Sequence, residues 1–137
     1  MSIKNLKKEI KNKIYPDDIV LIVLLEVLNN KDFARYNPVN IHKGFYSYKQ
    51  KKRYKKLLNK FYFNPSTISP FSNQISKAIF RIQLSGILLT TAPEFNCFII
   101  KNRNKIKEKV RKKFTEKELR QMQEIAQKIS QFNKKGS

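Results

Sequence analysis

The chain has 137 residues, of which 40% are hydrophobic, so one compact domain with flanking tails is expected. Its 30 basic residues against 10 acidic ones give a net charge of +20, which predicts an anionic partner: nucleic acid first, a membrane surface second. One cysteine and one histidine exclude an internal disulfide and a cysteine-based zinc cluster. We therefore expect no enzyme, no metal, no cofactor, and a reducing compartment, cytoplasmic or otherwise, that contains nucleic acid.

Residues 1–14 predict a basic amphipathic helix, because apolar side chains recur at helical spacing among lysines. Its apolar positions are Ile3, Leu6, Ile10 and Ile14. Such a helix docks on its own domain, follows a phosphate backbone or lies on a membrane surface. Docking is the interpretation we favour, because the apolar side chains are few.

Pro16 suits the first turn of a second helix. Asp17 and Asp18 favour the positive end of its dipole, and we prefer this capping role to a paired-carboxylate metal site. Residues 19–28 are apolar almost throughout and predict the central buried helix, with a strand as the alternative. The longest apolar run, residues 19–25, is too short to cross a bilayer, so no integral membrane span is expected.

Residues 29–44 are typical of a loop, with Gly44 among the breakers and His42 as a surface or packing residue. Residues 43–60 hold eight basic and no acidic residues and predict a helix with one apolar side. The apolar positions are Tyr54, Leu57, Leu58 and Phe61. The basic side either contacts phosphates, which we favour, or is only solvated. The predicted phosphate-binding residues are Lys49, Lys51, Lys52, Arg53, Lys55 and Lys56.

Residues 69–101 predict a helix, a glycine stop and a hairpin. One face of the helix is apolar, with Phe71, Ile75, Ala78, Ile79 and Ile82. Long polar side chains that can reach base edges gather on another face, namely Asn73, Gln74, Lys77 and Arg81. Gly86 suits a left-handed helix end, and the β-rich runs 87–91 and 95–101 flank a turn at residues 92–94.

This order resembles the recognition helix and wing of winged helix-turn-helix proteins, most closely over residues 75–88. The resemblance implies a winged-helix-like domain at residues 15–103, with Asn73, Gln74, Lys77 and Arg81 reading bases. Lys101, Arg103 and Lys105 at the end of the wing then join the phosphate-binding set. The connection at residues 63–69 is longer than the tight turn of the simplest family members. The alternative is an ordinary core helix packed on a hairpin.

Residues 104–133 predict a short basic helix and then an amphipathic one, with residues 134–137 as a disordered tail. Thr115 and Glu118 have the spacing of a capping box at the start of the second helix. Its apolar residues Leu119, Met122, Ala126 and Ile129 have the spacing of a coiled-coil seam. The helix therefore either supports a homodimer or packs on its own domain.

The predicted fold class is α+β, mostly helical, with one hairpin. The first functional hypothesis is duplex DNA binding, in transcription, replication or plasmid and phage maintenance. The second is a structural RNA-binding protein such as a ribosomal protein, because basic residues are spread along nearly the whole chain. The third is a membrane-surface or protein-interaction module.

Overall fold

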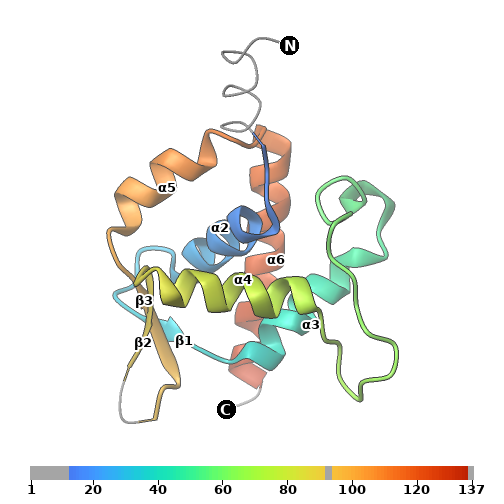
Figure 1. Ribbon diagram of the computed structural model, residues 1–137, viewed down its shortest axis with the longest axis horizontal. Coiled ribbons are helices and arrows are strands. Elements are labelled where there is room, and N and C mark those ends of the chain that lie inside the picture. Colours follow the sequence, from blue (N-terminus) through green and yellow to red (C-terminus); the bar gives the residue numbers. More distant parts are fainter. Residues whose placement is uncertain (1–12, 92–93, 136–137) are drawn as a thin grey trace.

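The computed structural model of the protein describes residues 13–91 and 94–135. Helices make up most of this part, and a small antiparallel sheet lies at one end (Figure 1). The helices are α2 (Pro16–Leu28), α3 (Pro38–Lys49), α4 (Asn73–Leu84), α5 (Arg103–Arg111) and α6 (Glu116–Lys135), with a 3-10 turn at Lys52–Tyr54. The strands are β1 (Ala34–Arg35), β2 (Leu88–Thr90) and β3 (Cys97–Ile100). The predicted class, α+β and mostly helical, is confirmed.

Helix α2 is the centre of the hydrophobic core, as its nearly continuous apolar sequence predicts. Val20, Val23 and Leu24 are completely buried, because α4 packs against one side of α2 and α6 against another. Pro16 occupies the first turn, and the Asp18 carboxylate accepts the backbone N–H of Tyr15 at 3.0 Å. The predicted capping role of Asp18 is therefore confirmed.

The sheet has the order β1-β3-β2, with both pairs antiparallel. The hairpin of β2 and β3 confirms the two predicted strands, while residues 92–93 of the predicted turn lie outside the described part of the chain. Strand β1 pairs with the other edge of β3, through Ala34 opposite Phe98. Strand β1 lies within the segment predicted as a loop. The sequence does not indicate this strand, because two residues are too few to show strand periodicity.

The boundaries predicted for the second basic helix are wrong. Helix α3 begins at Pro38, inside the predicted loop, and ends at Lys49, and the chain then makes short turns instead of continuing as a helix to residue 60. Gly44 lies within α3 and is a close-packing residue, since a Cβ there would overlap the side chain of Ile129 on α6. The apolar positions predicted after α3 are nevertheless buried, namely Tyr54, Leu57, Leu58 and Phe61.

Helix α6 belongs to the core and is not an appended extension. The predicted capping box is confirmed: Thr115 Oγ1 accepts the N–H of Glu118 at 3.1 Å, and the Glu118 carboxylate accepts the N–H of Thr115 at 2.9 Å. The helix packs against α2 and α3, where Met122 is 0% and Ile129 1% exposed. The coiled-coil seam is therefore buried inside the chain, which removes the basis for the predicted homodimer.

The prediction of a disordered tail from residue 134 is also wrong for its first part. Helix α6 continues to Lys135, and residues 136–137 lie outside the described part. The helix end is held because Asn133 is buried and its Oδ1 accepts a hydrogen bond from Asn40 on α3 at 2.9 Å.

Two further expectations concern the membrane and the N-terminus. Within residues 13–91 and 94–135, no helix combines the length and the apolar character needed to cross a membrane. Residues 1–12 of the predicted N-terminal helix lie outside the described part of the chain.

Candidate nucleic-acid interface

Helix α4 has a side-chain cap at its start and the predicted glycine after its end. Ser72 is the N-cap, and its side chain accepts the N–H of Ile75 at 3.4 Å. After the C-terminal residue Leu84, the chain leaves the helix through Gly86, which has a left-handed φ of 79°. The predicted helix and glycine stop are therefore confirmed.

The buried face of α4 packs against α2 through the predicted apolar positions. Ile75 and Ala78 are completely buried, and Ile79 and Ile82 are nearly so. Phe71 is the exception, because it precedes the helix and stacks on the His42 ring with 4.9 Å between centroids.

His42 fixes the start of α4 against α3. Its Nδ1 accepts the backbone N–H of Ser72 at 3.0 Å, in a buried position. Burial lowers the pKa of His42, which favours the neutral ring that this acceptor role requires. His42 is therefore a packing residue, which is one of the two roles expected for it.

The four predicted base-reading residues are divided by the structure. Asn73 and Lys77 are exposed on the outer face of α4. Gln74 is turned back, because its Oε1 accepts the N–H of Tyr62 at 3.0 Å and the Ser72 hydroxyl at 3.1 Å. Arg81 makes two hydrogen bonds of 2.7 Å to the Asp17 carboxylate on α2.

Sequence reasoning missed two apolar members of the exposed face of α4. Phe80 is 59% exposed and Leu84 71% exposed. Both are in phase with Asn73 and Lys77, at helical steps of three and four. The helical spacing indicates their position, but apolar side chains do not fit a set defined by hydrogen-bond donors.

Three carboxylates of α2 form ion pairs with basic side chains of other segments. Besides Asp17 with Arg81, Asp18 pairs with Lys113 at 3.1 Å and Glu26 with Lys107 at 3.2 Å. These ion pairs connect α2 to α4, to α5 and to the segment between α5 and α6. The negative charge of these three carboxylates is therefore balanced by basic partners within the chain. Many lysines, in contrast, remain at the surface.

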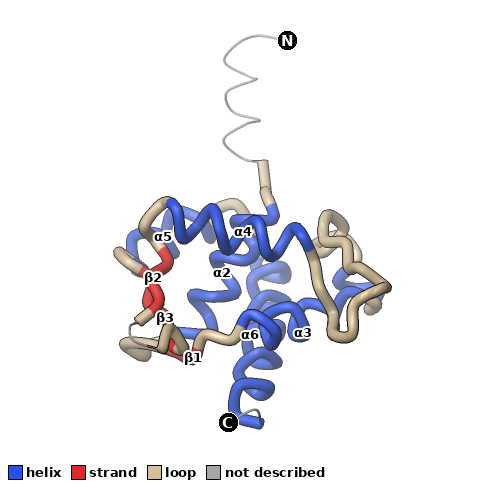
Figure 2. The backbone as a smooth tube through the Cα atoms, turned by 60° about the horizontal axis from the view of Figure 1, so that its bottom comes forward, coloured by secondary structure: helices blue, strands red, loops and turns tan. Residues whose placement is uncertain are grey.

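The predicted phosphate-binding residues form two groups at opposite ends of α4. One follows α3 and faces the N-terminal end of α4, whereas the other begins α5, beside the sheet and the C-terminal end of α4 (Figures 1 and 2). The exposed lysines in these groups, for which the structure describes no carboxylate partner, are Lys51, Lys52, Lys55, Lys56, Lys101 and Lys105.

The remaining three predicted phosphate ligands have structural contacts. Lys49 Nζ donates to the Leu58 carbonyl at 2.8 Å, and burial lowers the pKa of this lysine. Arg53 pairs with Glu124 at 3.1 Å. Arg103 donates to the Lys31 carbonyl. Within the first group, Lys51 also lies over the Tyr48 ring at 4.6 Å.

An open cleft lies between α3 and residues 62–70. This cleft has a volume of about 550 Å³ and is lined by the aromatic rings of Tyr46, Tyr62 and Phe63 and by Lys49. Tyr46 and Phe63 meet edge to face with 5.2 Å between centroids. The rings of Tyr62 and Phe63 enter the cleft from a segment that follows α3 along the chain.

No protein-family model matches the chain, and neither a curated protein nor a solved structure matches it.

Proposed function

We propose that the protein is a non-enzymatic DNA-binding protein of the winged-helix type, with α4 entering the major groove. The observation that carries this proposal is the position of α4. Its exposed face lies between two groups of exposed lysines, while the carboxylate of Asp17 beside it is already paired. Such a surface attracts a phosphate backbone and leaves side chains on α4 available to base edges.

The dimensions of α4 are compatible with this role. Its 12 residues make a helix about 18 Å long, and the major groove is about 12 Å wide. A helix that crosses the groove therefore brings both of its ends close to phosphates. The order of helix, glycine stop and hairpin adds support, because it is the order in which the sequence resembles the winged-helix family.

Within this proposal the outer side chains of α4 have distinct roles. Lys77 can donate to guanine and Asn73 can pair with adenine, while Phe80 can contact a thymine methyl group. Arg81 stays at the edge of the interface, where Asp17 holds it. The exposed lysines Lys52, Lys55, Lys56, Lys101 and Lys105 contact phosphates.

Structured RNA is the second candidate, and the aromatic cleft favours it. Tyr46, Tyr62 and Phe63 lie together beside Lys49, and unstacked bases bind to such combinations of rings and positive charge.

A competition experiment at near-physiological salt separates these candidates. We expect duplex DNA to displace a labelled duplex more effectively than folded RNA or anionic vesicles. Lys77→Ala should weaken a selected duplex more than random duplex, whereas Lys52→Ala should weaken both alike. Lys117→Ala removes the same charge from the first turn of α6 and serves as the control.

Two outcomes would contradict DNA reading by α4. If Lys77→Ala and Lys117→Ala weaken all duplexes equally, the affinity reflects total charge. If folded RNA binds most tightly and Tyr46→Ala abolishes that binding, the RNA candidate replaces the first.

A further inference from the structure

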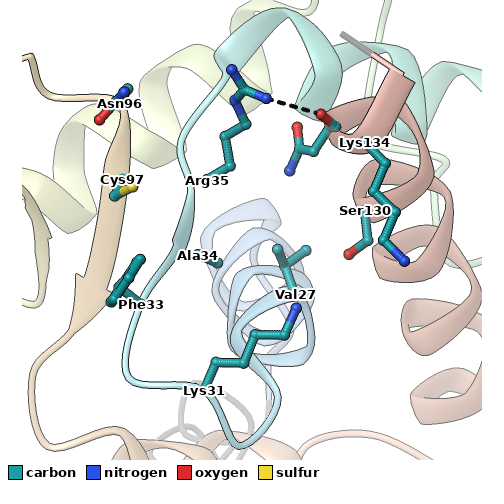
Figure 3. Close-up of a pocket in the computed structure, with 10 residues that line it drawn as sticks. Val27, Lys31, Phe33, Ala34, Arg35, Asn96, Cys97, Ser130 and Lys134 are labelled. Carbon is teal, nitrogen blue, oxygen red and sulfur yellow. Dashed lines mark hydrogen bonds between the residues drawn. The ribbon is translucent and has the colours of Figure 1, made fainter. Parts of the chain in front are cut away.

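A second cavity lies away from the exposed face of α4, where the end of α2, strands β1 and β3 and the end of α6 meet (Figure 3). Its volume is about 560 Å³, within the range of about 300–1,000 Å³ that small-molecule sites occupy. The walls come from four separate elements of the chain, so the cavity is a product of the fold.

The charged side chains in the lining of this cavity are all basic, and its neutral polar side chains are Asn96, Ser130 and Asn133. Lys31, Arg35 and Lys134 contribute positive charges from three segments. The Oδ1 of Asn133 already accepts a hydrogen bond from Asn40, which leaves its amide nitrogen as the group that can donate to a ligand. In Figure 3, the Lys31 and Lys134 side chains both extend toward the region of Ser130.

This arrangement suits an anion. Basic side chains along the wall of a cavity attract a negatively charged ligand. Arg35 is also held in place, because its guanidinium donates to the Asn133 carbonyl at 3.1 Å (Figure 3). A guanidinium held in this way loses little side-chain entropy when it binds phosphate oxygens.

The apolar part of the lining indicates what accompanies the anionic group. Phe33 is 59% exposed and lines the same cavity as the buried side chains of Val27 and Ala34. An exposed aromatic ring beside a cationic pocket can stack on a nucleobase. We propose that this cavity binds a nucleoside phosphate, either a free mononucleotide or the terminal nucleotide of a 5′-phosphorylated strand.

Cys97 allows occupancy to be measured directly. It is the single cysteine of the chain, is half-buried, and lines the cavity. The rate at which neutral iodoacetamide alkylates its thiol therefore reports whether the cavity is filled. We expect adenosine monophosphate to slow alkylation saturably at near-physiological salt, and calorimetric titration to give the same affinity.

Charge-matched variants separate the cavity from the general charge of the protein. Lys31→Gln should raise the half-protecting concentration of adenosine monophosphate about tenfold, because it removes a charged hydrogen-bond donor. Lys112→Gln, which removes the same charge after α5, should change it by less than about twofold, as for a surface site outside the cavity. Both lysines are exposed, so neither substitution should impair folding.

The source of the phosphate is decided by three probes: adenosine monophosphate, a 5′-phosphorylated oligonucleotide and the same oligonucleotide without its phosphate. Protection by either phosphorylated probe, but not by the unphosphorylated one, supports the proposal and identifies the source. Equal effects of Lys31→Gln and Lys112→Gln would overturn it. Absence of protection by both phosphorylated probes at millimolar concentration, with no heat of binding, would also overturn it.

Discussion

Replacing Phe80 with alanine tests whether α4 faces the bases. Phe80 is 59% exposed in the free protein, on the outer face of α4. Complete burial of a phenylalanine side chain stabilises by about 1.5–3 kcal/mol. Since more than half of the residue is still accessible, contact with a thymine methyl should contribute about 1–2 kcal/mol to binding. Phe80→Ala should therefore weaken a selected duplex by about 5–30-fold.

The assay is fluorescence anisotropy with a duplex selected by the native protein from a random pool. The same duplex is then prepared with uracil in place of each thymine in turn, which removes only the methyl group. At one position, uracil should weaken the native protein and have little effect on Phe80→Ala. Such coupling identifies the pair of groups in contact, as in a double-mutant cycle.

Two controls protect this interpretation. Phe80→Ala should change the free energy of unfolding by less than about 0.5 kcal/mol, because the side chain is mostly exposed. Tyr62→Ala removes another exposed ring, outside α4, and should leave duplex affinity nearly unchanged. Unchanged affinity of Phe80→Ala, or equal loss with every uracil duplex in both proteins, would refute the placement of Phe80 against a thymine.

Further predictions concern charge, packing and pH. Lys52→Ala should reduce the slope of log affinity against log salt by about one, whereas Lys49→Ala should lower stability and leave the slope nearly unchanged. Gly44→Ala should lower the free energy of unfolding in urea by about 1–3 kcal/mol, because the new methyl overlaps Ile129. Because burial lowers the pKa of His42, the folded state binds this proton less readily than the unfolded state, so stability should decrease as pH falls below about 6.5. Urea unfolding between about pH 7.5 and 5.5 should show a smaller decrease for His42→Gln.

The ion pair between α2 and α4 illustrates how the site depends on tertiary contacts. Arg81 and Asp17 are 64 positions apart, and nothing in the spacing of either residue indicates the other. The carboxylate was predicted as a capping group, and the guanidinium as a base reader. Their meeting across the interface between α2 and α4 moves Arg81 to the edge of the proposed DNA surface.

The amino-acid sequence by itself determined features that depend on neighbours along the chain. The apolar run after Pro16 predicted the buried helix α2, and the Thr115–Glu118 spacing predicted the start of α6. Apolar periodicity and Gly86 likewise predicted α4 and its end. Periodicity and capping act within one or two helical turns, so the residues that produce them can be read in order.

Only the tertiary structure decided which surfaces those elements bury and which they leave exposed. The close packing of α3 on α6 depends on Gly44, because Ile129 lies where a side chain at that position would be, and β1 forms by pairing with the free edge of β3. The apolar stripe of α6 has a spacing that suits a second copy of the chain as well as its own domain. In the structure this stripe packs against α2 and α3. A helical stripe specifies that one face is to be buried, but the partner is selected by the free energy of packing among distant segments, which local spacing does not encode.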